Sequence, residues 1–280
     1  MTMGPNFSVC ASPGGTPPFC IELHYSSSVD ASLQAVFEAA AARWVKIVIG
    51  GVPPFLMRED TINGLRIIAE VSPLPGPIGS AATTKVDTEY LREPGETPAR
   101  WDYLPALATI TLDAVLLPEL SDEQRLELVS HEMGHALGFI VEIWEQKGLV
   151  QRNESTDTPV FTGPHARTSY GTLRGLPPTD VPLENYGLDH RFISHWKQSI
   201  FHTDLMTAVL EDGVNLVCPV TVAALQDMGY EVGAPERTDI DLNDPVLAIS
   251  PPGTAFLALP VFLLNDQPGL TRPIPRPIIP

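Results

Sequence analysis

The chain has 280 residues, of which 44% are hydrophobic, so it can bury a sizeable core in one large domain or in two lobes around a cleft. Its formal net charge of −17 argues against nucleic-acid binding, which needs Lys and Arg to neutralise phosphates, and against attraction to anionic membranes. No apolar run reaches the roughly 18 residues of a transmembrane segment.

The first half of the chain predicts a small sheet backed by helices. Residues 1–19 are rich in Gly, Pro and Ser and are expected to form a loose arm. An amphipathic, Ala-rich helix is predicted over 29–48, with Asp30 or Ser32 as its N-cap. The predicted strands cover 20–25, 65–71, 81–86 and 109–112. An edge strand of the sheet that they form could pair with an extended peptide.

A second helix carries the most informative motif, the sequence HEMGH at 131–135. Residues four apart share a helix face, so His131 and His135 can present two imidazoles to one metal ion. Glu132 lies between them, where it can serve as a general base. Gly138 follows at the position where a glycine can turn the chain sharply. This spacing is typical of zinc peptidases, with two His ligands and a carboxylate base.

The motif alone leaves the third metal ligand open, although catalytic zinc usually has three protein ligands. Val141 occupies the position, six residues after His135, where a compact three-histidine motif has its last ligand. Either a glutamate serves instead, or a histidine follows after an insertion. The glutamate candidates are Glu142, Glu145, Glu154 and Glu184, and the histidine candidates are His165, His190, His195 and His202.

The second half of the chain reads as loops with short helices. Residues 139–194 form an insertion punctuated by Gly and Pro, with one short helix near 165–173. A further short helix is predicted over 219–228. The predicted organisation is an N-terminal arm at 1–19, a catalytic subdomain with the zinc helix at 20–138, a C-terminal subdomain at 139–240, and a Pro-rich, extended tail at 241–280.

Several separated motifs resemble the leishmanolysin family of metzincin metallopeptidases. After the HExxH motif come SHW at 194–196, DLM at 204–206 and DMGY at 227–230, in the order found in that family. Other similar segments are FEAAAARW at 37–44, FTG at 161–163 and VPLEN at 181–185. The resemblance extends over about residues 20–232.

This resemblance implies an α+β, metzincin-like zincin fold, in which a small twisted mixed sheet with two long helices and a loop-rich C-terminal subdomain flank an active-site cleft. It implies Zn²⁺ ligands His131, His135 and His195, the general base Glu132, and Met206 as the methionine of the Met-turn. The implied function is a zinc-dependent endopeptidase that hydrolyses peptide or protein substrates by Glu-assisted attack of a zinc-bound water. The alternative is a zinc-binding leishmanolysin-like protein with little or no peptidase activity.

The remaining expectations concern the oxyanion and the cell compartment. The family often places a Tyr near the oxyanion, and the candidates are Tyr170, Tyr186 and Tyr230. The three cysteines, Cys10, Cys20 and Cys218, allow one disulfide with a free thiol or three free thiols. Family members tend to be secreted, which suggests an extracellular protein. The first 18 residues lack the basic and apolar regions of a signal peptide, so a cytoplasmic location stays open.

Overall fold

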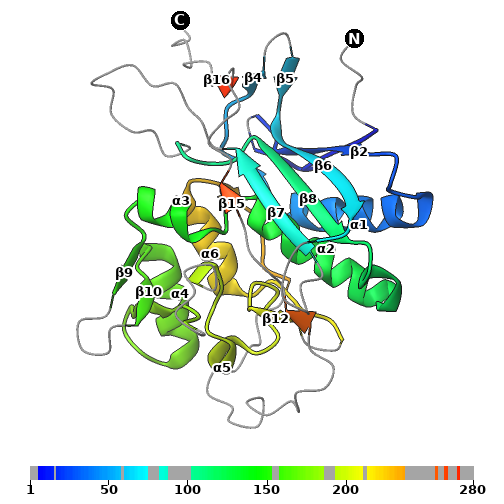
Figure 1. Cartoon of the computed structure of the whole chain (residues 1–280). Helices are drawn as coiled ribbons and strands as arrows, with labels where there is room; N and C mark the ends of the chain where they lie inside the picture. Colours follow the sequence, from blue (N-terminus) through cyan, green and yellow to red (C-terminus); the bar gives the residue numbers. More distant parts are fainter. Residues whose placement is uncertain are drawn as a thin grey trace, which may run out of the picture.

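The computed structural model of the chain describes residues 6–15, 17–57, 60–74, 82–87, 102–152, 158–185, 193–210 and 213–236, with the strand residues 256–257, 262–263 and 270–271. The fold is mixed α+β, as predicted, and is compatible with a metzincin-like fold (Figure 1). A mixed sheet with two long helices occupies one part of the molecule, and the short helices and strands of the second half of the chain lie beside it.

The main sheet has the strand order β1-β2-β6-β8-β7-β15. Strands β2, β6 and β8 are parallel to one another, whereas β1 runs antiparallel to β2 and β7 runs antiparallel to β8; β15 runs parallel to β7. The four predicted strands are confirmed, and each predicted boundary lies within two residues of the observed one. The bounds are β1 Phe7–Cys10, β2 Cys20–Tyr25, β6 Gly64–Ser72, β7 Ala82–Asp87, β8 Leu107–Asp113 and β15 Phe262–Leu263.

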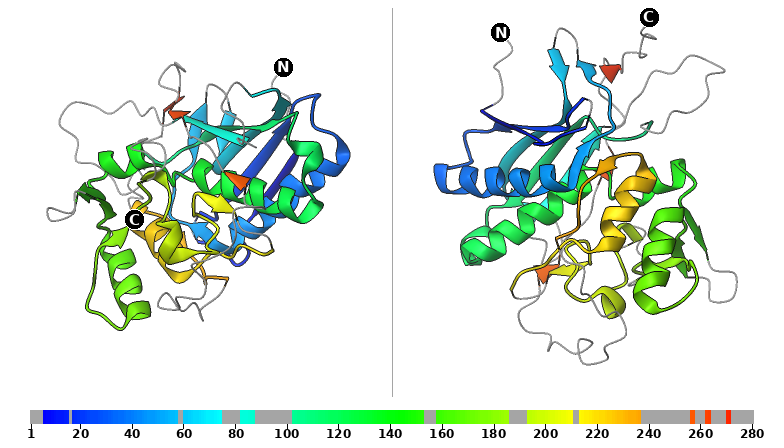
Figure 2. Two further views of the ribbon diagram at one scale, coloured as in Figure 1. Left: turned by 60° about the horizontal axis from the view of Figure 1, so that its bottom comes forward. Right: turned by 180° about the vertical axis from the view of Figure 1, so that it is seen from behind.

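Helices α1 (Ala31–Ile47) and α2 (Asp122–Ala136) cover one face of this sheet (Figure 2, right). The α1 helix begins where Asp30 accepts a hydrogen bond from the backbone N–H of Leu33, so Asp30 is its N-cap. Ser121 caps α2 in a reciprocal capping box with Gln124. The buried side of α1 follows helical spacing: Leu33, Phe37, Ala40, Ala41, Trp44, Val45 and Ile47.

The N-terminal arm is a correction to the sequence analysis. Residues 7–10 form β1, which pairs antiparallel with β2, and a disulfide joins Cys10 to Cys20 at directly opposite positions of the two strands. The strand has only four residues, and the Gly and Pro residues around it gave the segment the composition of a loop. Of the two alternatives that the sequence left open, the structure has one disulfide with a free thiol, since Cys218 is buried and not bonded to another cysteine.

The insertion is more ordered than expected. The helix predicted near 165–173 is α4 (Pro164–Arg174), and α6 (Pro219–Met228) matches its prediction. The expectation of one short helix in the insertion is wrong, because α3 (Val141–Gln146) and a three-stranded sheet are also present. That sheet comprises β9 Val150–Arg152, β10 Pro159–Phe161 and β11 Val181–Pro182, and α5 (Gln198–Phe201) follows it.

Helix α4 is held by a residue from α6. The carboxylate of Asp227 accepts hydrogen bonds from the backbone N–H groups of His165 and Ala166, each at 2.9 Å. Asp227 therefore caps α4 from another element, and it satisfies N–H groups that a helix start leaves unpaired. A Cβ on Gly163 would overlap this carboxylate, which explains the glycine just before α4.

The remaining elements are short. The Pro-rich tail was expected to be an extended appendage, and three two-residue pieces of it pair with other strands; its other residues lie outside the described ones. No helix in the described ranges is long and apolar enough to span a membrane. Two small sheets have two strands each: β3 (Val48–Gly50) with β13 (Glu231–Val232), and β12 (Val209–Leu210) with β14 (Phe256–Leu257). A third has three strands, with β4 (Phe55–Met57) between β5 (Asp60–Ile62) and β16 (Leu270–Thr271). A 3₁₀ turn covers Leu117–Glu119.

Candidate metal centre

The second half of α2 is buried on all sides, although it carries three ionisable side chains. His131, Glu132 and His135 each have 0% of their surface exposed. Burying such groups is costly unless each finds a polar partner or an ion. Their presence inside the core therefore marks a site rather than an ordinary packing surface.

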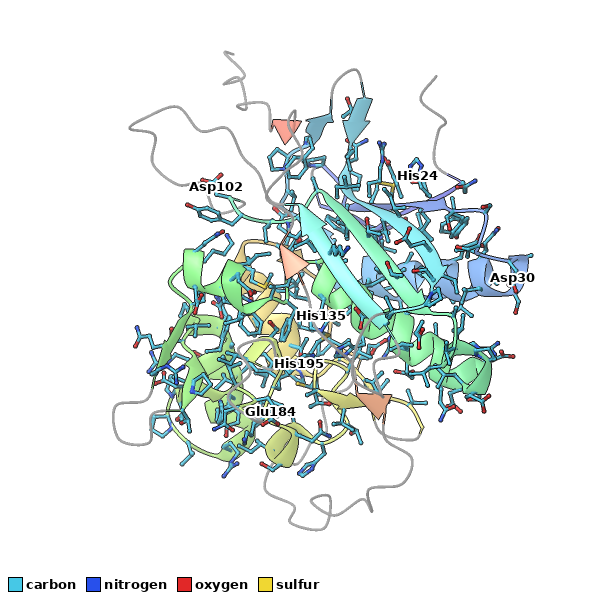
Figure 3. All side chains as sticks on the ribbon, in the orientation of Figure 1. His24, Asp30, Asp102, His135, Glu184 and His195 are labelled. Atoms are coloured by element: carbon cyan, nitrogen blue, oxygen red, sulfur yellow. A yellow bond between two sulfur atoms is a disulfide. The ribbon has the colours of Figure 1, made fainter. Side chains whose placement is uncertain are left out.

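A third histidine reaches the same point from a distant part of the chain. His195 is 1% exposed and precedes Trp196, which bridges to Leu183 on one side and Thr207 on the other. The Nε2 atom of His135 lies 2.9 Å from that of His131 and 3.1 Å from that of His195, and the latter two are 3.3 Å apart. Figure 3 shows His135 and His195 side by side in the middle of the molecule. The three imidazoles form a group that could hold one metal ion.

The hydrogen bonds of the other ring nitrogens support this interpretation. Nδ1 of His131 lies 2.6 Å from the carbonyl oxygen of Leu205, and Nδ1 of His135 lies 2.7 Å from that of Phe139. A carbonyl only accepts, so each Nδ1 must carry the proton, and each Nε2 of a neutral ring is then an acceptor. Two acceptors at 2.9 Å cannot hydrogen-bond to each other. A cation between these lone pairs resolves the conflict, and backbone carbonyls behind the rings are typical of metal-ligating histidines.

Burial also keeps the imidazoles neutral. It lowers the pKa of His131 to about 4, although the carbonyl of Leu205 acts in the opposite direction. Burial likewise lowers the pKa of His135 well below its ordinary value, with the two neighbouring histidines adding to the effect. Neutral rings at physiological pH are the form that binds a metal ion.

The two carboxylate oxygens of Glu132 have different surroundings. Its Oε2 accepts a hydrogen bond from the hydroxyl of Thr84 on β7. Its Oε1 is buried and has no hydrogen-bond partner among the described residues. Burial raises the pKa of Glu132 to about 8, and the bond from Thr84 opposes that rise. A carboxylate with an unpartnered oxygen, on the residue that follows His131, fits a group that exchanges a proton with a molecule entering the site.

Comparisons with known proteins agree with this geometry. The family model described as leishmanolysin, of the M8 peptidases, matches residues 98–234, which include all three histidines and Glu132. A leishmanolysin homolog of Crithidia fasciculata is 30% identical over 135 residues. The chain is leishmanolysin-like. This confirms the resemblance predicted from the motifs.

Two further relatives are similarly distant from this leishmanolysin-like chain. Leishmanolysin of Leishmania chagasi is 29% identical over 137 residues, and the ciliated left-right organizer metallopeptidase of Xenopus laevis is 28% identical over 140 residues. The matches cover 44–45% of this chain and 19–22% of the relatives. The chain thus aligns with only about a fifth of the length of each relative.

Met206, the predicted Met-turn residue, lies against the HEMGH motif at 131–135. A Cβ on Gly134 would overlap the sulfur of Met206, so glycine leaves room for the buried side chain of Met206 to pack against α2 between His131 and His135. Gly138 has a φ of +98°, and its N–H donates to the carbonyl of His135 at 2.8 Å. It therefore ends the helix in the left-handed conformation that favours glycine, as the sequence predicts.

Replacing Gly134 by Ala should destabilise the protein by about 1–3 kcal/mol, because an added methyl overpacks the Met206 contact. Helix propensity alone predicts the opposite sign, a gain of about 1 kcal/mol. Chemical denaturation of the wild type and G134A measures the difference. In a Met206→Ala background the same substitution should cost little, since the methyl then has room. An equal loss in both backgrounds would contradict the contact.

The turn that carries Met206 is held by a buried network that the sequence analysis missed. Asp204 is 0% exposed and accepts from the backbone N–H of Met206 at 2.8 Å and from the hydroxyl of Thr221 at 3.0 Å. That hydroxyl also accepts from the indole N–H of Trp196 at 2.7 Å. Thr221 on α6 thus links the turn to the residue that follows His195.

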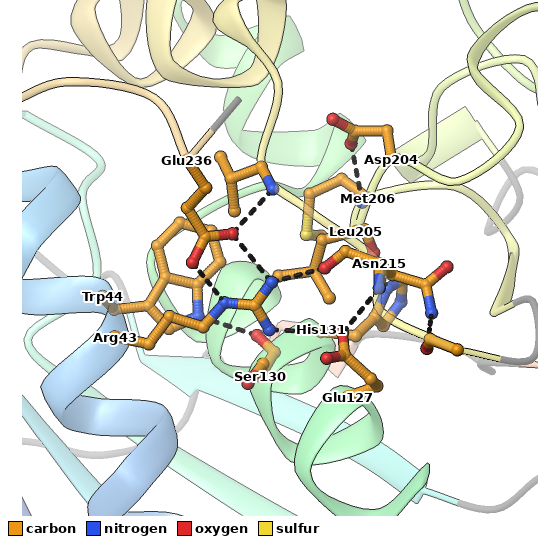
Figure 4. Close-up of polar contacts among 12 residues, drawn as sticks. Arg43, Trp44, Glu127, Ser130, His131, Asp204, Leu205, Met206, Asn215 and Glu236 are labelled. Atoms are coloured by element: carbon orange, nitrogen blue, oxygen red, sulfur yellow. Dashed lines mark hydrogen bonds and ion pairs between the residues drawn. The ribbon is translucent and has the colours of Figure 1, made fainter. Parts of the chain in front are cut away.

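A cluster of ion pairs joins α1, α2 and the segment at Glu236 (Figure 4). Arg43 contacts Glu127 at 3.2 Å and Glu236 at 2.7 Å, and it also donates to the carbonyl of Asn215. Glu127 lies one helical turn before His131 and accepts from the N–H of Asn215 at 3.2 Å. The cluster therefore ties α2 to the segment that follows the turn containing Met206.

The other candidate ligands lie outside the histidine group. Glu184 accepts hydrogen bonds from Lys197 and from the N–H of Gln198, each at 2.9 Å, so it supports the segment after His195. His165 bonds to Asp227. Among the described residues, the group that could hold a metal ion contains only the three histidines, which leaves out Glu142, Glu145 and His202; Glu154 and His190 are outside the described residues.

The two tyrosine candidates for the oxyanion that the structure describes, Tyr170 and Tyr230, interact with other groups. The hydroxyl of Tyr230 donates to the carbonyl of Leu137 at 2.8 Å. Tyr170 is 5% exposed and stacks on Phe201, with 5.7 Å between ring centroids. Tyr186 lies outside the described residues. Neither described tyrosine contacts the histidine group through these interactions.

Proposed function

We propose that this leishmanolysin-like chain is a zinc-dependent endopeptidase. One observation carries the proposal: three imidazole Nε2 atoms converge within 3.3 Å of one another, and the residue after His131 carries a buried carboxylate with an unpartnered oxygen. Three protein ligands and an adjacent carboxylate base are the composition of a catalytic zinc site rather than a structural one. A purely structural site uses four protein ligands and has no need of Glu132.

In this proposal His131, His135 and His195 hold the metal through their Nε2 atoms. A bound zinc ion would supply Lewis acidity, which makes water more acidic and polarises a carbonyl group. Met206 contacts α2 between two of these ligands without contributing a ligand atom itself. The carbonyl oxygens of Leu205 and Phe139 orient the first two rings by accepting their Nδ1 protons.

Glu132 acts as the general base and then as the general acid. Its Oε1 accepts a proton from the attacking water and later returns it to the amine nitrogen that leaves when the peptide bond breaks. The carboxylate is fully buried, so bulk water does not compete for this proton. Glu132 directly follows His131 in α2, so the proposed base and the first proposed ligand lie on one rigid element.

Strand β7 is the element that suits an extended peptide substrate. It contacts α2, and its residue Thr84 touches Glu132. Its outer edge pairs in parallel with the two-residue strand β15, so that edge accepts an extended segment through backbone hydrogen bonds. A peptide substrate would compete with β15 for this edge. We also propose that the active-site cleft lies between the subdomains at 20–138 and 139–240.

The Cys10–Cys20 disulfide favours an oxidising compartment, and we include an extracellular location in the proposal. Disulfides form and persist outside the reducing cytosol. Reduction of this bond in the protein isolated from its native source would argue for the cytoplasmic alternative. Mass spectrometry of alkylated peptides measures its state.

Removal and return of the metal test the proposed activity. The purified protein should cleave an unfolded protein substrate, lose that activity after treatment with a chelator, and regain it when one equivalent of Zn²⁺ is added. Magnesium, which prefers oxygen ligands, should not restore cleavage. Cleavage that persists in the metal-free protein would overturn the proposal. Full zinc loading without cleavage of any unfolded substrate would favour the zinc-binding alternative.

A further inference from the structure

We propose that Thr84 is a positioning residue for Glu132, an inference that rests on the proposed function. Its hydroxyl holds Oε2 of the carboxylate, so that Oε1 is the oxygen that exchanges the proton. Thr84 lies outside the HExxH motif, on strand β7, and no motif in the sequence singles it out. The role is therefore visible only in the fold.

The contact is buried and directional. Thr84 is 0% exposed, and its hydroxyl donates to Oε2 of Glu132. The backbone carbonyl of Glu132 lies farther from the same hydroxyl, at 3.2 Å. A hydroxyl has one hydrogen to donate, and a carboxylate oxygen is a stronger acceptor than a carbonyl. The hydrogen bond to Oε2 therefore dominates.

The strand gives Thr84 the rigidity that positioning requires. β7 pairs along its length with β8, with Thr84 opposite Ile110, and Ala82 and Val86 are also fully buried. The β-branched side chain of threonine has restricted rotation about χ1. A glutamate side chain has three rotatable bonds and would lose orientation without such an anchor. Thr84 thus transfers the fixed geometry of the sheet to a flexible group on α2.

The two carboxylate oxygens consequently have different tasks. Oε2 already accepts a hydrogen bond, whereas Oε1 is buried without a partner among the residues that the structure describes. The oxygen without a donor is the more basic of the two and the more available to an entering molecule. Loss of the Thr84 hydroxyl would leave both oxygens equivalent and the carboxylate free to turn.

Three variants of the full chain, loaded with zinc, test this role. Thr84→Val keeps the shape of the side chain and removes the hydroxyl, and we expect kcat to fall by about 10–100-fold at unchanged KM and zinc content. Thr84→Ser keeps the hydroxyl, so its kcat should stay within about threefold of the wild type. The matched control is Thr111→Val, which removes a hydroxyl bonded to Glu70 in the same sheet and should leave kcat unchanged.

Two results would overturn the proposal: an unchanged kcat in T84V, or a loss in T84S as large as that in T84V. A loss of zinc in T84V would also overturn it, since the residue would then act on the metal site as a whole. Structural damage alone would lower kcat in T111V as well.

Thermal unfolding separates this inference from the proposed function. T84V should lower Tm by about 3 °C in the wild-type background, where Oε2 is left buried without a donor. In a Glu132→Ala background the same substitution should leave Tm nearly unchanged. If the wild type cleaves nothing, the proposed function fails, and this comparison alone decides whether Thr84 holds Glu132. Equal shifts in both backgrounds would overturn the contact.

Discussion

Glu132→Gln should lower kcat by about 10²–10⁴-fold while the protein remains folded and zinc-loaded. The amide has the shape of the carboxylate and keeps an oxygen that can accept from Thr84. It cannot take a proton from water at neutral pH, so the general base is lost. Cleavage of a fluorogenic peptide measures kcat, and elemental analysis measures the zinc content.

A glutamate elsewhere on the same helix provides the matched control. Glu123 is exposed in the first turn of α2, and Glu123→Gln should leave kcat unchanged. Equal activities of the wild type and E132Q would mean that a contaminant cleaves the substrate or that another group is the base. The second of these explanations would remove Glu132 from the mechanism.

His195→Ala should weaken zinc binding by more than about 100-fold, the upper end of the loss seen when only an outer-shell partner of a ligand is removed. The reason is that the Nε2 of His195 is one of three nitrogens in the group, and the other two lie on one helix. Titration against a chromophoric chelator measures the affinity. The rise in Tm that zinc gives the wild type should be lost as well.

The control for this variant is His165→Ala, because His165 bonds to Asp227 and lies outside the histidine group. Its zinc affinity should match that of the wild type. Zinc binding that survives H195A would contradict the three-histidine site and would favour a glutamate as the third ligand.

The sequence predicted the features of the site that depend on local spacing. His131 and His135 share a helix face because they are four residues apart, and Gly138 ends that helix because a sharp turn there needs a positive φ. The separation of 60 residues between His135 and His195 has no local rule behind it. Only the resemblance to a family connected them, and the structure brings their imidazoles together.

Other features depended on contacts between distant segments. Thr84 meets Glu132 from a strand 48 residues away, and periodicity only suggested that 81–86 is an edge strand. Residues 7–10 looked like an arm because four residues among Gly and Pro give too short a pattern. Pairing with β2 and the disulfide to Cys20 make them a strand. Helix α3 is only six residues long, so its pattern was equally weak.

Anomalous X-ray scattering from crystals of the zinc-loaded protein, recorded on both sides of the zinc absorption edge, tests the central claim most directly. The account predicts one strong zinc peak about 2.0–2.1 Å from the Nε2 atoms of His131, His135 and His195, with Glu132 next to it and not bound. A peak with a glutamate in place of His195, or zinc bound only at the surface, would contradict it.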